Sequence, residues 1–552
     1  MKIGAPLAGT EAALETNRLP TTRKVSLAGM LEMNPRRFLL LFTLVYFVAE
    51  FCSTVHRPLF FDELCMYYIA DVPSIGRIWD LIAKGMELNP PLPFWLTWMV
   101  HHSIGKGEFL SRLPSLIGFW AMCICLYQFV RRRSDVLHGF VAMLLPLFTF
   151  AHWFGTCARG YGLLLGFSAG ALLCWQYAID RERRTFALIG IAVCLAGAVS
   201  CHYYAVYVIG AIGTGEIVGA LRRKKVDIAT LASIALGLIP LIIYRKLIST
   251  ATKSTHTFWV SSSPQFLYDS YAGLIGSIFM VVLAFFALTI QTKRESDLPE
   301  GALNRALTRE ELVTCSVLAG MPLVFFASSL VAPVPFYTRY VLPVVLGSTV
   351  LSVCFVHRFG GANVRSRRTL ISILIWFCLL PWAGWHTLMY FIQDPYEAVL
   401  GGTKIPVKVE PTLPLVVDNV DDFLMLYFYS PETFRTRLFT LDSSESSLKY
   451  LKSNVEMNSI ELLQGFHDVH LVSYQEFISS HHEFLIARVR AEGWILQKLI
   501  EDGDDVELLT VKKDPGYFAD ETLVFRVKIK HVAAKQTGLN SINGFGTEVP
   551  RN

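Results

Sequence analysis

The feature that most restricts the fold of this 552-residue chain is a series of long apolar runs in its first two-thirds. Each run has about 18 or more residues, which is enough to cross the roughly 30 Å hydrocarbon layer of a bilayer as a helix. Such runs form helices because lipid offers the backbone no other hydrogen-bond partner. Composition agrees, since 53% of the residues are hydrophobic and 17% are charged. The sequence therefore predicts a polytopic α-helical membrane protein.

We expect about eleven transmembrane helices. They lie near residues 38–55, 112–130, 138–155, 161–179, 186–201, 203–220, 228–246, 271–290, 312–331, 340–357 and 369–391. The segment 93–104 is too short and too interrupted to span the bilayer. Its tryptophans favour a position at the membrane interface.

The basic clusters predict the orientation. "NPRRF" precedes the first span, and further clusters follow at every second crossing, at residues 131–135, 181–184, 222–225, 292–295 and 365–368. Because short cytoplasmic loops are enriched in Lys and Arg, the N-terminus is predicted to be cytoplasmic. An odd number of spans then places the C-terminal region outside, in an extracytoplasmic position.

Four regions follow from this topology. We expect a cytoplasmic segment at 1–36, a transmembrane domain at 37–392 with a first outer loop at 56–111, a small extracytoplasmic domain at 393–532 and a disordered tail at 533–552. In the third region, strand-like segments (413–417, 482–489, 521–530) alternate with helix-like segments (421–429, 446–457, 493–503). This alternation predicts an α/β domain.

The outer loops contain an unusual set of charges. "FFDELCMYY" places Asp62 and Glu63 between aromatic residues, and Arg112, Arg159 and Arg339 lie at outer boundaries that the positive-inside tendency disfavours. Ionisable groups at membrane depth suggest function, and together these could form an anion pocket beside an acid/base group. The alternative is that the acids form a solvated helix cap and each arginine reaches lipid phosphates.

Several aromatic residues share these loops. Tyrosines at a membrane boundary usually form an interfacial belt, and His202 is equally compatible with packing or with ligand binding. We detect no metal-binding motif, although Asp62 and Glu63 could share an ion. The eleven cysteines include no CxxC pair and are interpreted as small apolar residues.

The order of the motifs resembles the GT-C glycosyltransferases. These motifs are the acidic pair, "NPPLPFWL", "SRLPS", "ARGYGLLLGFSA", "HYYA" and "TRYVLP", over roughly residues 38 to 360. The resemblance is to the branch that contains protein O-mannosyltransferases, aminoarabinose transferases (ArnT) and RgtA/B/C/D-like bacterial enzymes. It implies the GT-C fold and inverting transfer of a sugar from a polyprenyl-monophosphate donor to an acceptor on the outer face.

The resemblance also implies roles for individual residues. The first-loop aspartate is the catalytic residue in this family, which corresponds to Asp62, with Glu63 beside it. Basic residues at the outer surface hold the lipid phosphate, and the candidates are Arg159, Arg339, Arg112 and Lys84. The expected substrate pocket contains Tyr67, Tyr68, Tyr161, His202, Tyr203 and Tyr337.

The expected setting is the cytoplasmic (inner) membrane of a bacterium. The partners would be a polyprenyl-phosphate sugar, membrane lipids and an envelope glycan, lipid or protein as acceptor, with no nucleic acid. No cofactor is required by the residues, and a divalent metal remains an alternative. The rival function is a lipid or sugar transporter or flippase. Against it, the sequence lacks two similar halves, and its charges gather at one membrane face.

Overall fold

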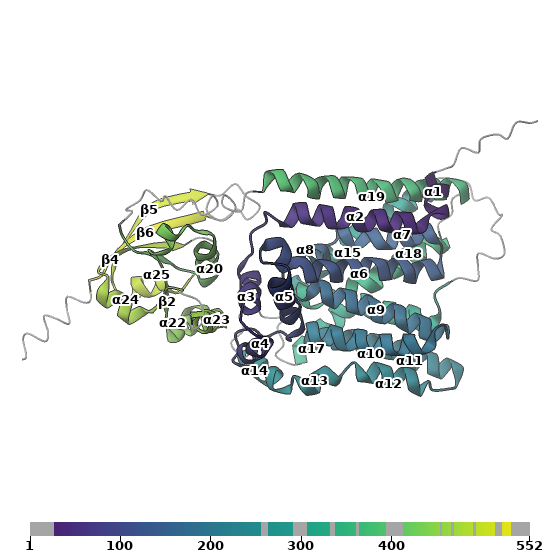
Figure 1. Cartoon of the computed structure of the whole chain (residues 1–552), viewed down its shortest axis with the longest axis horizontal. Helices are drawn as coiled ribbons and strands as arrows, with labels where there is room; N and C mark the ends of the chain where they lie inside the picture. The colour runs from purple at the N-terminus through teal and green to yellow at the C-terminus, as the bar shows by residue number, and fades with distance from the viewer. Residues whose placement is uncertain are drawn as a thin grey trace, which may run out of the picture.

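The computed structural model describes residues 27–255, 263–290, 306–331, 337–359, 364–393, 412–452, 455–464, 469–488, 493–513 and 521–530. An elongated bundle of helices forms one part, and a smaller domain built on a sheet lies at one end of it (Figure 1). The N-terminal residues 1–26 and the predicted tail at 533–552 lie outside the described residues.

The bundle and the loops at its ends contain α1 (Leu27–Met33), α2 (Pro35–Thr54), α3 (Phe61–Ala70), α4 (Ile75–Ala83), α5 (Leu92–Ser103), α6 (Glu108–Arg133), α7 (Val136–Leu144), η1 (Leu145–Phe148), α8 (Phe150–Gly155), α9 (Tyr161–Ile179), α10 (Arg184–Cys201), η2 (Tyr203–Ala205), α11 (Val206–Arg223), α12 (Ile228–Leu236), α13 (Ile239–Ile243), α14 (Arg245–Thr255), α15 (Pro264–Ile290), α16 (Arg309–Ala319), α17 (Met321–Val331), η4 (Thr338–Tyr340), α18 (Val344–Phe359) and α19 (Val364–Ile392).

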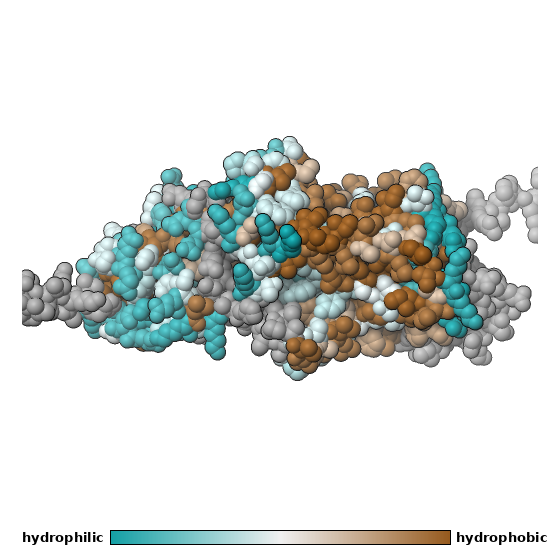
Figure 2. Space-filling view, turned by 90° about the horizontal axis from the view of Figure 1, so that it is seen from below, coloured by the Kyte–Doolittle hydropathy of each residue, from teal (hydrophilic) through white to brown (hydrophobic). Residues whose placement is uncertain are grey.

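The eleven predicted segments are mainly helical where the structure describes them, with short non-helical breaks in several of them, as at Thr149, Tyr244 and 341–343. Within the described residues, seven helices are long and apolar enough to cross a membrane, or nine if two bent pairs, α12–α14 and α16–α17, each form one span. Two shorter apolar helices occupy Val136–Phe148 and Val344–Phe359. On the face shown in Figure 2, a broad hydrophobic surface on the bundle lies between two hydrophilic zones. The chain is thus a polytopic helical membrane protein, and the count of eleven crossings stays a prediction.

Helices α6 and α9 pack unusually closely. Gly162 and Gly166 lie one turn apart on α9, and a Cβ atom added at Gly166 would lie 2.4 Å from the carbonyl oxygen of Gly118 on α6. Small residues at this spacing allow two helix backbones in a membrane to approach each other. The contact holds the start of α9, and hence the preceding residue Arg159, close to the first turns of α6.

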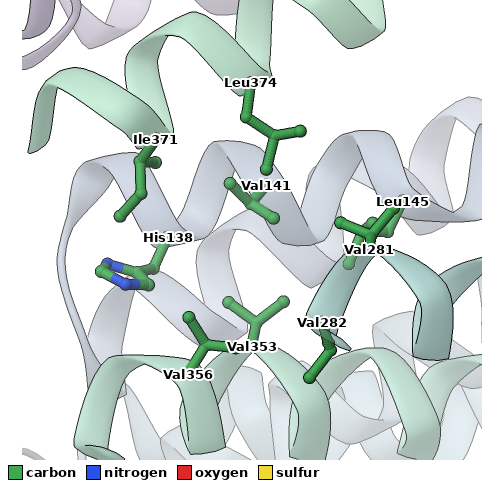
Figure 3. Close-up of a pocket in the computed structure, with 9 residues that line it drawn as sticks. All are labelled: His138, Val141, Leu145, Val281, Val282, Val353, Val356, Ile371 and Leu374. Atoms are coloured by element: carbon green, nitrogen blue, oxygen red, sulfur yellow. The ribbon is translucent and has the colours of Figure 1, made fainter. Parts of the chain in front are cut away.

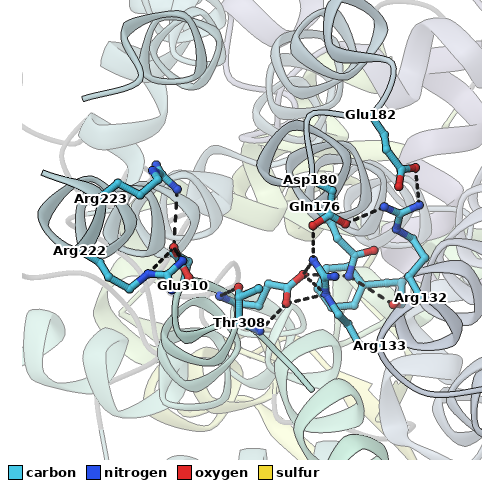
Figure 4. Close-up of polar contacts among 11 residues, drawn as sticks. Arg132, Arg133, Gln176, Asp180, Glu182, Arg222, Arg223, Thr308 and Glu310 are labelled. Atoms are coloured by element: carbon cyan, nitrogen blue, oxygen red, sulfur yellow. Dashed lines mark hydrogen bonds and ion pairs between the residues drawn. The ribbon is translucent and has the colours of Figure 1, made fainter. Parts of the chain in front are cut away.

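The end of the bundle away from the sheet is held by ion pairs. Arg132 pairs with Asp180 at 2.6 Å, Arg133 pairs with Glu311 at 2.8 Å, and Arg222 pairs with Glu310 at 2.8 Å. These contacts join α6, α9, α11 and α16 (Figure 4). We call this region the basic end. The predicted cluster at 292–295 lies outside the described residues.

The C-terminal domain is α/β, as predicted. Its elements are β1 (Leu415–Val417), α20 (Val420–Tyr429), α21 (Glu432–Arg435), β2 (Leu438–Asp442), α22 (Ser444–Leu451), α23 (Val455–Gln464), β3 (Leu471–Ser473), α24 (Tyr474–Ser480), β4 (Glu483–Arg488), α25 (Ile495–Glu501), β5 (Asp505–Lys513) and β6 (Glu521–Lys528).

The six strands form one sheet in the order β3-β2-β1-β4-β6-β5. The first four are parallel, with Val416 opposite Phe439 on one side and Ile486 on the other, and β6 and β5 continue the sheet antiparallel. Strands β1, β4 and β6 were predicted. Sequence analysis missed β2, β3 and β5.

The sheet domain shares a hydrophobic core with the helices at its end of the bundle. Leu64 and Ile69 of α3 belong to the same buried cluster as Leu415, Phe423 and Ile486 of the sheet domain. Tyr429 adds polar contacts, since its hydroxyl donates to Glu108 at 3.1 Å and accepts from the backbone N–H of Leu59 at 2.7 Å. The domain therefore packs directly on the helix that carries Asp62.

Candidate active site

Asp62 faces a cation that lies far away in the sequence. It occupies the first turn of α3, and its Oδ2 accepts a 2.9 Å hydrogen bond from Nη1 of Arg339 in η4. The two side chains are 28% and 23% exposed. The ring of Tyr337 lies against this guanidinium, 4.9 Å from its central carbon. The structure thus brings together two residues that were predicted separately to belong to the site.

Arg159 completes this cluster. Its Nη1 donates to the backbone carbonyl of Asp62 at 3.0 Å and to Oε2 of Glu87 at 2.6 Å. Glu87 also accepts at Oε1 from the side-chain amide of Asn89 at 2.9 Å. Arg159 is 6% exposed, so Glu87 supplies the opposite charge that a buried guanidinium needs. We call Asp62, Glu87, Arg159 and Arg339 the Asp62 cluster.

Glu63 points into a different environment. Its two oxygens accept from Nε and Nη2 of Arg112 at 2.8 and 2.6 Å, and both side chains are fully buried. The backbone N–H of Ala158 donates to Oε1 at 2.6 Å, and that of Phe60 donates to Oε2 at 3.3 Å. Glu63 therefore combines the capping of α3 with a bidentate ion pair. This arrangement favours a structural role over the catalytic one we expected.

The three candidate arginines differ in their free donors. Arg112 uses all five N–H groups, because it also donates to the carbonyls of Thr54, Arg57 and Pro58. The hydrogen bonds of Arg159 to Asp62 and Glu87, in contrast, both leave from Nη1. The Nε of Arg339 has no partner among the residues that the structure describes. Arg159 and Arg339 can thus donate to a phosphate, whereas Arg112 has no N–H left for one.

A small pocket adjoins the Asp62 cluster. Its lining comes from α3, α5, α9 and the segments beside them, and comprises Met66, Asn89, Pro93, Phe94, Arg159, Gly160, Tyr161, Cys201 and His202. His202 is buried, and its Nδ1 accepts from the backbone N–H of Tyr204 at 3.3 Å. Burial and the charges of Arg339 and Arg159 lower the pKa of His202 to about 3. His202 is therefore a neutral wall residue at physiological pH.

The charges around Asp62 set its protonation. Partial burial acts to raise the pKa of Asp62, but the charges of Arg159 and Arg339 and the hydrogen bond from Arg339 outweigh it and lower the pKa below its usual value. In the arrangement observed, Asp62 is a firmly ionised carboxylate.

The remaining predicted residues separate into two groups. Tyr161 and His202 line the pocket, and Tyr337 contacts Arg339. The hydroxyl of Tyr203 is buried and has no partner within the described residues. Tyr67 and Tyr68, by contrast, pack against Phe428 of the sheet domain, with ring centroids 5.2 and 5.9 Å away. Lys84 is exposed at the end of α4, and no contact joins it to the Asp62 cluster.

Sequence analysis missed Glu87 and Asn89 as site residues. Both lie in "ELNPPLPFW", a segment in which Pro90 and Pro91 favour a rigid turn. That turn places Glu87 opposite Arg159, 72 residues further along. One sequence signal was available. Glu87 is an acid in the outer loop, and Arg159 at the membrane boundary needs an acidic partner.

Asp62 and Glu63 do not converge on one point that could hold a metal ion. One carboxylate turns to Arg339, and both oxygens of the other are occupied by Arg112 and backbone N–H groups. Among the described residues, two other groups bring three potential ligands together, Glu50 with His152 and His386, and Asp135 with His138 and His357. The shared ion that we considered for the acidic pair therefore does not fit this geometry.

A second pocket lies away from the Asp62 cluster. Figure 3 shows His138 at one end of it, and the rest of the lining is apolar: Val141, Leu145, Val281, Val282, Val353, Val356, Ile371 and Leu374. These residues come from α7, η1, α15, α18 and α19. The pocket offers one polar side chain and no pair of groups for acid/base chemistry.

Comparison with known proteins gives both a sequence match and a fold match. Residues 88–249 match the family model of dolichyl-phosphate-mannose-protein mannosyltransferases. A search of curated proteins finds no match. The crystal structure of ArnT from Cupriavidus metallidurans in the apo state superposes with a TM-score of 0.54 at 12% identity, covering 89% of this chain and 98% of that one.

Two further solved structures are similar at lower scores. ArnT from the same organism bound to undecaprenyl phosphate has a TM-score of 0.49 at 13% identity, covering 89% of this chain and 98% of that one. The Archaeoglobus fulgidus oligosaccharyltransferase in complex with zinc and sulfate has a TM-score of 0.41 at 11% identity, covering 81% and 67%.

The helical bundle, its first outer loop and the C-terminal α/β domain define a membrane protein with the GT-C fold, as the apo ArnT comparison shows. The fold and the family-model match over residues 88–249 agree with the predicted resemblance to the GT-C superfamily. The motifs that predicted this superfamily include the segments that form the Asp62 cluster.

Proposed function

We propose that this chain is a glycosyltransferase that moves a sugar from a polyprenyl-monophosphate donor to an acceptor at the Asp62 cluster. The observation that carries the proposal is the contact of Asp62 with Arg339 and Arg159, beside a pocket at the end of the bundle. An ionised carboxylate and two cations with unused donors are the groups that such a transfer needs. The matched family model, which describes a dolichyl-phosphate-mannose enzyme, supports the donor class.

Each group has a chemical role in the proposed step. The acceptor oxygen or nitrogen attacks the anomeric carbon, and the bond from that carbon to the phosphate oxygen breaks. The polyprenyl phosphate leaves with the electron pair, and the acceptor's proton passes to Asp62. Fixed cations stabilise the charge that develops on the leaving phosphate, which is the role of Arg159 and Arg339. A single displacement of this kind inverts the anomeric centre.

Binding of the donor also changes Asp62. The donor phosphate takes Nη1 of Arg339, which Asp62 holds in the observed arrangement. The negative phosphate offsets the cations that lower the pKa of Asp62, so this pKa rises towards the working pH. A general base is most effective when its pKa is near the working pH. Asp62 would therefore become an effective base only after the donor has bound.

We further propose that the site faces the outside of the cytoplasmic membrane. The basic end lies at the opposite end of the bundle from the sheet domain (Figures 1 and 4), and clustered arginines favour the cytoplasmic side. In this orientation the sheet domain and the Asp62 cluster are extracytoplasmic, where an envelope lipid, glycan or protein can reach them.

The proposal is tested by incubating the purified protein with a synthetic short-chain polyprenyl-phosphate sugar and candidate acceptors. Release of polyprenyl phosphate is measured without an ion gradient or a nucleotide. Sugar transfer under these conditions supports the proposed function and excludes a transporter as its explanation. Donor that crosses the bilayer intact and is never cleaved would contradict it.

A further inference from the structure

A second cluster of polar groups is buried between three helices. Glu50 of α2 is fully buried, and its Oε1 lies 2.6 Å from Nε2 of His152 on α8. His386 of α19 completes the group, in which one ligand atom from each residue lies within 4.8 Å of the others. The three residues stand 102 and 234 positions apart in the chain, so the fold brings them together.

Hydrogen bonds around the cluster orient its side chains so that they can bind a cation. His386 places Nδ1 2.9 Å from the backbone carbonyl of Trp382. A carbonyl can only accept, so Nδ1 carries the proton and Nε2 keeps its lone pair. Histidines that bind metals are usually oriented in this way. Glu50 is steadied by Ser53, whose hydroxyl lies 3.4 Å from Oε2.

Burial of the Glu50 carboxylate among apolar side chains costs free energy unless a positive charge or a cation pairs with it. The rings of Trp382 and Phe119 lie 5.9 and 5.4 Å from that of His152, so the walls of the cluster are aromatic. A carboxylate buried in a membrane-spanning helix is expensive and marks a functional site. The nearby Arg57 is already engaged, since it donates to the carbonyl of Thr156 at 2.7 Å and covers the ring of Trp153.

We propose that Glu50, His152 and His386 bind a Zn²⁺ ion. Two imidazoles and one carboxylate form a donor set that zinc uses when its fourth position stays open. Ligands about 2.0–2.1 Å from a tetrahedral ion stand roughly 3.3 Å from each other. Because the two ligand atoms now lie 2.6 Å apart, Glu50 and His152 need to separate by roughly 0.7 Å. The ion would cross-link α2, α8 and α19, and His386, which is half-buried, would lie at the open side.

The other acid-and-histidine group is a weaker candidate. Asp135 caps α7, and its carboxylate is 41% exposed and lies 2.9 Å from Nδ1 of His138, three residues further along. Local capping explains this contact without an ion. The Glu50 group has no such local explanation, because its members come from three separate helices.

The test measures zinc bound to the full chain, purified in detergent without a histidine tag and equilibrated with buffered free zinc. We expect about one Zn²⁺ per chain for the unaltered protein. Glu50→Gln and His386→Gln should each weaken binding by about 100-fold or more. His102→Gln is the matched control, because His102 makes the same bond to a carbonyl four residues earlier, at 2.9 Å from Trp98, but has no acidic partner in the described part of the chain.

Three results would overturn the proposal. The first is that the unaltered protein binds no zinc. The second is that the Glu50→Gln and His386→Gln variants bind as much zinc as the unaltered protein. The third is that Asp135→Asn, and not these two variants, abolishes zinc binding. If a variant fails to fold, the unaltered protein still gives an answer. Zinc should slow the chemical modification of His152 and His386, and equal rates with and without zinc would contradict the site. These readouts do not depend on the proposed glycosyl transfer.

Discussion

Nη1 of Arg339 donates a 2.9 Å hydrogen bond to Oδ2 of Asp62 across 277 residues of sequence. The bond joins the first turn of α3 to η4, at the end of the bundle on which the sheet domain packs. In the proposed reaction these two groups act on opposite sides of one displacement. The carboxylate takes the acceptor's proton, and the guanidinium takes the charge of the leaving phosphate.

This contact predicts a pH profile that depends on the donor. The pKa of Asp62 is lowered in the free protein, so the acid limb of kcat/KM for the donor should fall below the usual range of an aspartate. Bound phosphate offsets the two cations, so the acid limb of kcat should lie at higher pH. Rates measured from pH 3 to 8 at low and saturating donor test this. Identical limbs would mean that the phosphate does not interact with Asp62 and its arginines.

Removal of a phosphate-binding arginine should weaken donor binding. A hydrogen bond to a charged group contributes about 1.5–3 kcal/mol, so Arg339→Ala should raise the donor Kd by roughly ten- to a hundredfold. Arg339→Lys keeps the charge but loses the planar set of N–H donors. Its donor Kd should therefore lie between that of the unaltered protein and that of Arg339→Ala. Binding of a labelled donor to protein in nanodiscs measures both variants. An unchanged Kd in Arg339→Ala would remove this residue from the phosphate site.

Arg159 requires a paired control because it neutralises Glu87. Arg159→Ala leaves a buried carboxylate without its partner, whereas Arg159→Ala combined with Glu87→Gln does not. We expect the double variant to regain thermal stability but not donor affinity. Recovery of both properties would show that Arg159 serves only to hold Glu87.

Glu63 and Arg112 should affect stability more than catalysis. Breaking a fully buried ion pair by removing one partner costs about 3–5 kcal/mol. Glu63→Gln and Arg112→Gln should therefore lower the melting temperature and the yield of monodisperse protein. The folded fraction should keep its donor affinity. A stable Arg112→Gln protein with weakened donor binding would return Arg112 to the phosphate site.

The sheet domain should influence turnover through α3. Phe428 packs on Tyr67 and Tyr68, five and six residues after Asp62. Small displacements of a reacting group can cost about a hundredfold in rate, so we expect Phe428→Ala to lower kcat by roughly ten- to a hundredfold and to change donor Kd little. Phe439→Ala, which truncates a ring inside the sheet domain, is the control. Equal losses in both variants would indicate general destabilisation of the domain.

Much of the fold could be predicted from the sequence. Long apolar runs have few alternatives to helices in lipid, and the eleven predicted segments are mainly helical where described. The sheet domain was harder. Strands β2 and β3 are short, and β5, "DVELLTVKK", alternates only partly. The local hydrophobic pattern of the sequence cannot show that each of these three strands is stabilised by pairing with other strands of the sheet.

The membership of the site could be predicted only in part, since Asp62, Arg159 and Arg339 were expected there and Glu87 was not. Spacing did not show which carboxylate of the acidic pair faces the arginines, because both lie in the first turn of α3. Nor did it show that Arg112 would use all five donors, since three of its partners are backbone carbonyls at the end of α2 and in the loop that follows. These distinctions depend on how the loops fold over each other.

The most direct test of the central claim compares the unaltered protein with Asp62→Asn in single-turnover sugar transfer, together with donor binding. Loss of a general base typically costs about 10²–10⁴-fold in rate. The proposed function predicts a loss of this size in Asp62→Asn, with donor Kd unchanged or tighter because Arg339 is freed. Transfer by Asp62→Asn at the unaltered rate would contradict the assignment of Asp62 as the base.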